Sequence, residues 1–219
     1  DERKPIGAKR PRADIEGRLV FVTGGASGIG LGMARAFAAE GGCVALADNR
    51  RDALDAAADA LRAEGARVVT TTLDVRDEQQ WREALDRAEQ HFGPLAILCS
   101  NAGVAGSRLN IEDTEPSAWQ WTFDVNVNGA LYAVRHAVPR MRAHQGVGHI
   151  VLTSSMGAFL VRPGNGIYSA SKAAIVAIAE ALRGELDGSA LGVSILCPGL
   201  VSTQLIAGKV CFYRDLDSF

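Results

Sequence analysis

Short apolar runs alternate with helical patterns along most of the chain. Runs rich in β-favouring residues occupy 18–25, 43–48, 67–75, 95–103, 148–155 and 192–199. Their apolar positions are mostly continuous rather than alternating, which is typical of strands buried on both faces of a sheet. Helical patterns occupy 29–40, 51–64, 77–93, 116–144 and 168–187, and glycine ends several of them.

The order of these elements predicts the fold class. A helix connects most strands to the next, so the strands should run parallel with right-handed crossovers. The pattern predicts an α/β protein with a doubly wound parallel sheet and helices on both faces, a Rossmann-like arrangement. No internal repeat or interdomain linker divides residues 18–219. We interpret them as one domain, and residues 1–17 as a basic N-terminal arm.

Composition narrows the class of protein without naming a function. With 219 residues and 47% hydrophobic content, the chain can bury a substantial core, and its net charge of −2 gives no general attraction to nucleic acid or membranes. No apolar run approaches the ~20 residues of a membrane-spanning helix, and the polar N-terminus lacks the apolar core of a secretion signal. The four scattered cysteines (Cys43, Cys99, Cys197 and Cys211) lack metal-ligand spacing, which predicts free thiols in the cytoplasm and no bound metal.

A glycine-rich turn, TGGASGIG at 23–30, joins the first strand to the first helix. Gly24, Gly28 and Gly30 leave room for a pyrophosphate at the N–H groups of the helix N-terminus, and Ser27 would add a hydroxyl. Asp48 ends the second strand, where a carboxylate accepts hydrogen bonds from ribose hydroxyls and repels a 2′-phosphate. The turn therefore predicts a bound dinucleotide, NAD in preference to NADP. Arginines at 50 and 51 weigh against that preference, and a turn that merely packs helix on strand is the alternative.

A tyrosine and a lysine lie four residues apart in YSASK, 168–172. On the predicted helix Tyr168 and Lys172 share one face. A nearby ammonium favours the phenolate form of a tyrosine, which makes the phenol a better base near neutral pH. The pair is a candidate for proton transfer, and an ordinary surface pair is the alternative.

The order and spacing of several motifs resemble the short-chain dehydrogenase/reductase family from about Arg18 to Thr203. The motifs are TGGASGIG, LDV at 73–75, SNAG at 100–103, NVNG at 126–129, SS at 154–155, YSASK and PGLVST at 198–203. The resemblance implies hydride transfer between NAD(H) and a secondary alcohol or ketone. A non-catalytic dinucleotide-binding or regulatory protein on the same fold is the alternative.

The resemblance also implies roles for a catalytic group. Tyr168 would be the general acid/base, and Lys172 would favour its phenolate and hold the nicotinamide ribose. Ser155 would hydrogen-bond the substrate oxygen, and Asn126 would hold a water in a proton relay. Ser154 and Ser155 should point to opposite faces of a strand, and the spacing to Tyr168 favours Ser155.

Further residues are implied to contact the cofactor. They are Ile29 in the glycine turn, Asp74 and Val75 at the adenine, Asn101, Ala102 and Gly103 beside the ribose, and Pro198, Gly199, Val201 and Thr203 around the nicotinamide carboxamide.

The end of the chain departs from the family pattern, because only QLIAGKVCFYRDLDSF follows Thr203. We therefore expect most of the substrate-binding lobe to be lacking, through truncation or the absence of a stretch. KVCFY is a candidate last strand, but the ten residues from Gly199 to Gly208 leave barely enough length for a crossover. The arm carries five Lys/Arg and two Asp/Glu in residues 1–12, which suits a solvated tail or one packed on a neighbouring subunit better than nucleic-acid binding.

The helix over 168–187 predicts how the chain assembles. Its first part is apolar nearly all round, which predicts burial on nearly all sides. We expect it to pair with its copy, together with the helix over 116–144, in a homodimer or homotetramer. The expected ligands are a dinucleotide and a small alcohol or ketone, with neither nucleic acid nor membrane as partner.

Overall fold

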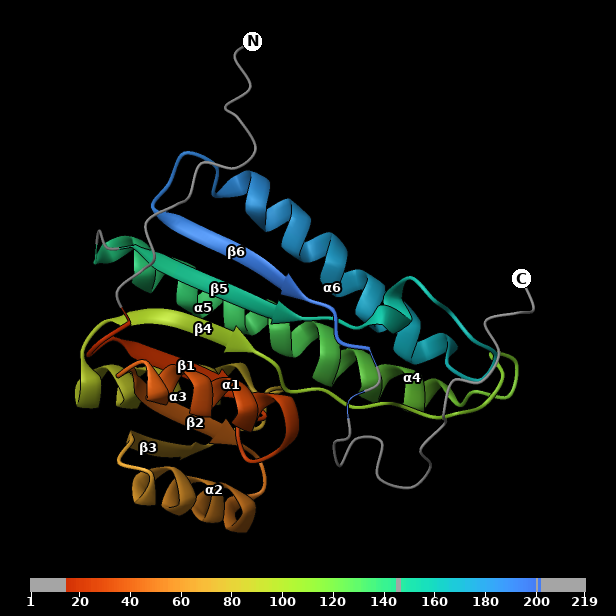
Figure 1. The fold of residues 1–219 in the computed structure, drawn as a ribbon. Helices are drawn as coiled ribbons and strands as arrows, with labels where there is room; N and C mark the ends of the chain where they lie inside the picture. Colours follow the sequence, from red (N-terminus) through yellow and green to blue (C-terminus); the bar gives the residue numbers. More distant parts are fainter. Residues whose placement is uncertain (1–14, 145–146, 200, 202–219) are drawn as a thin grey trace.

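Six parallel strands form the central layer of the protein. The computed structural model describes residues 15–144, 147–199 and 201. The strands lie in the order β3-β2-β1-β4-β5-β6 (Figure 1). From β1 to β3 each new strand is added on one side of the sheet, and from β4 to β6 on the other side, so the strand order reverses between β1 and β4. This is the doubly wound topology that the sequence predicted. The strands are β1 Leu19–Thr23, β2 Cys43–Asp48, β3 Arg67–Thr72, β4 Leu95–Ser100, β5 Gly148–Thr153 and β6 Leu191–Leu196.

Helices cover both faces of this sheet. The first pair, α1 (Gly28–Ala39) and α2 (Arg51–Ala63), packs against one face through residues such as Ala34 and Leu54. The other face carries α3 (Glu78–Phe92), α5 (Gly129–Ala143) and α6 (Gly166–Glu185). Burial of both faces explains the continuous apolar runs of the strands, since β1 and β2 are buried at every position.

Local signals in the sequence set the bounds of α3. The helix begins after Asp77, whose carboxylate accepts hydrogen bonds from the backbone N–H groups of Gln79 and Gln80 at 2.9 and 3.1 Å. It ends at Gly93, which has a φ of 84°. Between these ends, Trp81 is fully buried and donates its indole N–H to the carbonyl of Val75 at 3.0 Å.

The prediction of one α-helix over 116–144 was wrong in its middle. The structure has α4 (Pro116–Phe123), a π-helical turn (η1, Asp124–Asn128) and then α5. The wide turn includes Asn126, whose side chain makes hydrogen bonds to residues outside this helix. Such tertiary contacts compensate for the poorer backbone geometry of a π turn, and hydrophobic periodicity does not reveal them. A short 3₁₀ turn, η2 (Met156–Ala158), precedes α6.

Some expectations lie outside the described residues. These are most of the basic arm, Cys211, Thr203 and the segment KVCFY.

Candidate active site

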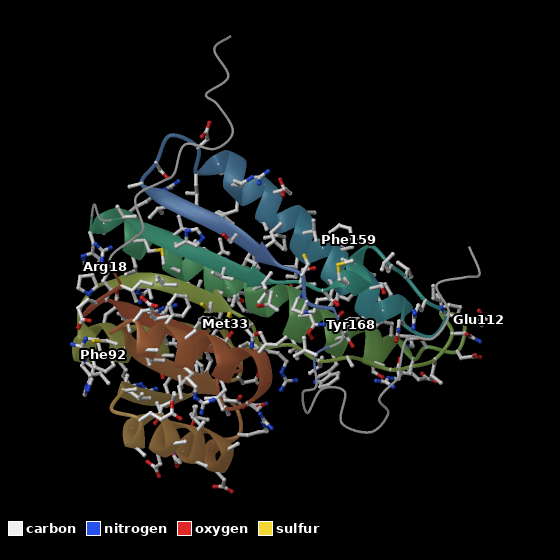
Figure 2. All side chains as sticks on the ribbon, in the orientation of Figure 1. Arg18, Met33, Phe92, Glu112, Phe159 and Tyr168 are labelled. Atoms are coloured by element: carbon white, nitrogen blue, oxygen red, sulfur yellow. The ribbon has the colours of Figure 1, made fainter. Side chains whose placement is uncertain are left out.

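A cavity of about 1110 Å³ opens at the carboxyl ends of the strands. Figure 2 shows Tyr168 on the side of the molecule where the strands end, and Arg18 at the opposite end of the sheet. Most of the predicted site residues line this one cavity. They are Gly24, Ser27, Gly28, Ile29, Asp48, Asp74, Val75, Asn101, Ala102, Gly103, Ser155, Tyr168, Lys172, Pro198, Gly199 and Val201.

The glycine turn is held against the end of β4. Asn101 donates its side-chain amide to the carbonyl of Thr23 at 3.1 Å, while the backbone N–H groups of Asn101 and Ala102 both donate to the Thr23 hydroxyl. A Cβ on Gly30 would collide with the carbonyl oxygen of Gly24 and lie 2.7 Å from the Asn101 amide nitrogen. Gly30 therefore packs the turn rather than lining the cavity.

The end of β2 contributes a fixed carboxylate. Asp48 is 7% exposed and accepts hydrogen bonds from the backbone N–H groups of Ala26 and Arg50 at 3.3 and 3.1 Å. The Arg50 guanidinium pairs with Asp48 at 3.2 Å and donates to the hydroxyl of Ser27 at 3.0 Å. The carboxylate, the arginine and the N-cap serine of α1 thus form one polar cluster at the edge of the cavity.

A second carboxylate lies beyond the end of β3. Asp74 pairs with Arg76 at 2.6 Å, and the Arg76 guanidinium holds the pKa of this carboxyl below its usual range. The backbone N–H of Asp74 donates a hydrogen bond to the side-chain oxygen of Gln80. Asp74 and Asp48 therefore present their carboxylates in the same half of the cavity, each beside an arginine.

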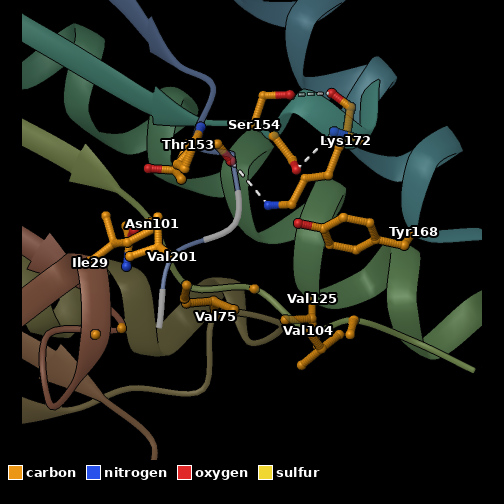
Figure 3. Close-up of a pocket in the computed structure, with 18 of the residues that line it drawn as sticks. Ile29, Val75, Asn101, Val104, Val125, Thr153, Ser154, Tyr168, Lys172 and Val201 are labelled. Carbon is orange, nitrogen blue, oxygen red and sulfur yellow. Dashed lines mark hydrogen bonds between the residues drawn. The ribbon is translucent and has the colours of Figure 1, made fainter. Parts of the chain in front are cut away.

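Tyr168 and Lys172 point into the other half of the cavity from the first turns of α6. The Lys172 ammonium lies 5.9 Å from the centroid of the Tyr168 ring, and Figure 3 shows the phenol oxygen directed toward it. Lys172 is 4% exposed and donates to the carbonyl of Thr153 at 3.0 Å. Burial lowers the pKa of Lys172 to about 8.

Ser154 and Ser155, which follow β5, both line the cavity and differ in their hydrogen bonds. Ser154 is buried and donates its hydroxyl to the carbonyl of Lys172 at 2.7 Å, so it fixes α6 to the sheet. Ser155 lines the cavity, and its hydroxyl oxygen accepts the backbone N–H of Gly157 at 3.0 Å. A Cβ on Gly157 would lie 3.2 Å from Tyr168 Cε1 and 3.4 Å from Ser155 Oγ. Ser155 and Tyr168 therefore flank the same small residue.

Asn126 lies behind the cavity and is 2% exposed. Its amide oxygen accepts the N–H of Val104 at 2.8 Å, and its amide nitrogen donates to the carbonyl of Val104 and the hydroxyl of Ser171. The Ser171 hydroxyl donates in turn to the carbonyl of Tyr168 at 2.7 Å. The asparagine thus connects the loop after β4 with the helix that carries Tyr168.

Comparison with known proteins identifies the family. The family model for short chain dehydrogenases matches residues 18–210. The chain belongs to the short-chain dehydrogenase/reductase family. A short chain dehydrogenase/reductase from Burkholderia phymatum, solved in complex with NAD, superimposes with a TM-score of 0.85 at 36% identity, covering 88% of this chain and 69% of that one.

Curated relatives of this short-chain dehydrogenase differ in length and in named activity. A glycine betaine reductase from Emericella nidulans is 39% identical over 94% of this chain, which spans only 16% of that protein. The 1-deoxy-11-beta-hydroxypentalenate dehydrogenase of Streptomyces exfoliatus is 37% identical over 89% of this chain and 71% of its own length. The C alpha-dehydrogenase of a Sphingobium species is 35% identical over 88% of this chain and 63% of its own length.

Sequence reasoning missed several residues of this short-chain dehydrogenase site. Thr23 begins the glycine motif, and its place at the end of an apolar strand was the available signal. Arg108 and Arg162 line the cavity from two loops, and no pattern in the sequence pairs them. Within the described ranges, no cluster of His, Cys, Asp and Glu is arranged to hold a metal, and no helix is long and apolar enough to cross a membrane.

Proposed function

We propose that this protein is an NAD-dependent oxidoreductase that interconverts a secondary alcohol and its ketone. One observation carries the proposal: the Tyr168 phenol, the Lys172 ammonium and the Ser155 hydroxyl meet in one cavity whose other half is built from the glycine turn and Asp48. A dinucleotide binder without activity has no need of that group of three side chains.

The residues present fit a dinucleotide. The turn at 24–30 offers the N-terminus of α1 to a pyrophosphate, with no side chains on Gly24 and Gly28. A Cβ on Gly103 would come within 3.2 Å of the Lys172 nitrogen, so this glycine keeps the ammonium open to the ribose hydroxyls of a bound dinucleotide. Asp48 is placed to accept hydrogen bonds from the other ribose, which supports NAD as the preferred cofactor.

Oxidation converts alcohol and NAD⁺ into ketone, NADH and one proton. A bound nicotinamide would supply the acceptor for the hydride that leaves the carbinol carbon. Tyr168 takes the hydroxyl proton as the C–O bond gains double-bond character, and in reduction it returns that proton to the oxygen. Ser155 holds the same oxygen by a hydrogen bond. Lys172 favours the phenolate through its positive charge, and Asn126 holds the loop and helix that position both.

The direction of the reaction does not change these roles, because each step runs in reverse with the same residues.

Cys43, Cys99 and Cys197 carry free thiols, which supports a reducing compartment such as the cytoplasm.

The test compares the protein with its Tyr168→Phe variant. NAD⁺ is mixed with secondary alcohols that include bulky aromatic and alicyclic examples, and NADH absorbance is followed. We expect turnover by the protein and a loss of about 10²-fold or more in Tyr168→Phe, with cofactor affinity nearly unchanged because the ring still packs. Retention of most activity in the variant would remove Tyr168 from the mechanism.

A further inference from the structure

Two arginines line the part of the cavity beyond the catalytic side chains. Arg108 lies on the loop after β4, and Arg162 lies on the segment between η2 and α6. These segments run against each other, because a Cβ on Gly164 would lie 3.5 Å from the carbonyl oxygen of Arg108. Both side chains are exposed, so both are accessible to a molecule that enters the cavity.

The distribution of charge separates this region from the dinucleotide half. Among the described residues of the lining, the carboxylates are Asp48 and Asp74, and they pair with Arg50 and Arg76. The lining contributed by the two loops carries the guanidinium groups of Arg108 and Arg162 and no carboxylate among the described lining residues. Its other lining residues include apolar side chains, namely Val104, Trp121, Val125, Met156 and Leu160.

We propose that the substrate is an apolar secondary alcohol or ketone that carries a carboxylate, and that Arg108 and Arg162 bind this carboxylate. A guanidinium donates two parallel hydrogen bonds to a carboxylate, which fixes the orientation of the bound molecule as well as its affinity. The apolar side chains would cover the body of the substrate while its hydroxyl reaches Tyr168. The inference rests on the proposed function, because it assigns the far end of the molecule on which Tyr168 acts.

A pair of substrates that differ in charge tests the inference. The two alcohols are 4-(1-hydroxyethyl)benzoate and its methyl ester, compared at low ionic strength with saturating NAD⁺. We expect kcat/KM to favour the carboxylate by about tenfold or more, mainly through KM, because the contact is made in ground state and transition state alike. High salt should weaken the preference, since the arginines are exposed.

Variants assign the preference to the two side chains. We expect Arg108→Gln and Arg162→Gln each to lower the carboxylate-to-ester ratio about threefold, and the double variant about tenfold. Arg108→Lys, which keeps the charge, should lose less than Arg108→Gln. Arg87→Gln is the matched control, because this exposed arginine lies on α3 and does not line the cavity. It should leave the ratio unchanged.

The outcomes separate this inference from the proposed function. Equal kcat/KM for acid and ester in the unmodified protein, or an unchanged ratio in the double variant, would overturn the carboxylate site while leaving the oxidoreductase intact. Equal losses on both substrates, with a lower melting temperature, would assign the arginines to folding and also overturn it. Calorimetric titration with 4-acetylbenzoate and its methyl ester makes the same comparison without turnover, so the inference stands or falls even where neither alcohol is oxidised.

Discussion

At the scale of single residues, we expect Asp48 to set the cofactor preference. Its carboxylate is fixed by two backbone N–H groups, so it would meet a 2′-phosphate as a rigid negative charge. The neighbouring Arg50 pairs with it and partly offsets that charge. We expect the balance of these two charges to favour NAD, because a ribose with free hydroxyls satisfies the carboxylate and a 2′-phosphate does not.

Replacement of Asp48 should therefore change which dinucleotide binds. We expect Asp48→Ala to weaken NAD about tenfold and to bring NADP to comparable affinity, since a lost charge-assisted hydrogen bond is worth about 1.5–3 kcal/mol. Asp48→Asn keeps an oxygen for the Ala26 N–H and should relax discrimination with a smaller loss for NAD. Asp55→Ala is the control, because this partly exposed carboxylate on α2 pairs with Arg51. Dissociation constants from calorimetry decide the matter, and tighter binding of NADP by the unmodified protein would refute the assignment.

Where a motif fixes both spacing and context, the sequence indicates which residues lie near one another, and their roles stay predictions. The separation of Ser155, Tyr168 and Lys172 along the chain placed all three in one cavity because one strand end and one helix carry them. The sequence did not predict that Asn126 would form hydrogen bonds with Val104 and Ser171, because these residues lie on distant segments of the chain. Its role in a water relay stays a prediction. Arg108 and Arg162 line the same cavity through the packing of two loops, for which the sequence has no periodicity.

Among the elements, the N-terminus of α1 depends on one close contact. Gly30 lies against the Gly24 carbonyl and the Asn101 amide, so the helix approaches the end of β4 only because position 30 has no side chain. Apolar continuity predicted the strands and glycine predicted the turn, but whether a glycine lines a cavity or packs a turn depends on neighbours far along the chain. The π turn between α4 and α5 was missed for the same reason.

Two glycines of α1 make a matched pair for testing this element. A methyl group on Gly30 would displace the turn, and we expect Gly30→Ala to cost about 1–3 kcal/mol of stability and to weaken dinucleotide binding. A methyl group on Gly32 would meet nothing within 4 Å, so Gly32→Ala should stabilise the helix by about 0.5–1 kcal/mol. Thermal unfolding and NAD titration measure both. Similar behaviour of the two variants would show that the contact at Gly30 has no special role.

At the scale of the whole molecule, the helical face opposite the sheet suggests association between copies. On α6, Ile175 and Ala179 are buried against the sheet, while Ala173 and Ala177 are exposed. Leu131 on α5 is 47% exposed. One described chain therefore leaves part of α6 uncovered, and we expect a second copy to cover the rest.

We expect a dimer or a dimer of dimers in solution through α5 and α6. Leu131→Arg should shift the population toward monomer, because it places a charge in an apolar contact. Val147→Arg is the control, since Val147 is also exposed, at 56%, but precedes β5 at the far end of the sheet. Light scattering at micromolar concentration reads the mass, and a particle of 23.1 kDa for the unmodified protein would contradict the assembly.

The central claim is that Tyr168 moves a proton while hydride leaves the carbinol carbon of an alcohol held beside it. Its most direct test follows the hydrogen itself, by incubating the protein with NAD⁺ and a secondary alcohol deuterated at that carbon. Mass spectrometry should find one deuterium in the NADH formed for each ketone produced, and almost none with Tyr168→Phe under the same conditions. Ketone without deuterium in the cofactor, or equal transfer by the Tyr168→Phe variant, would contradict the account.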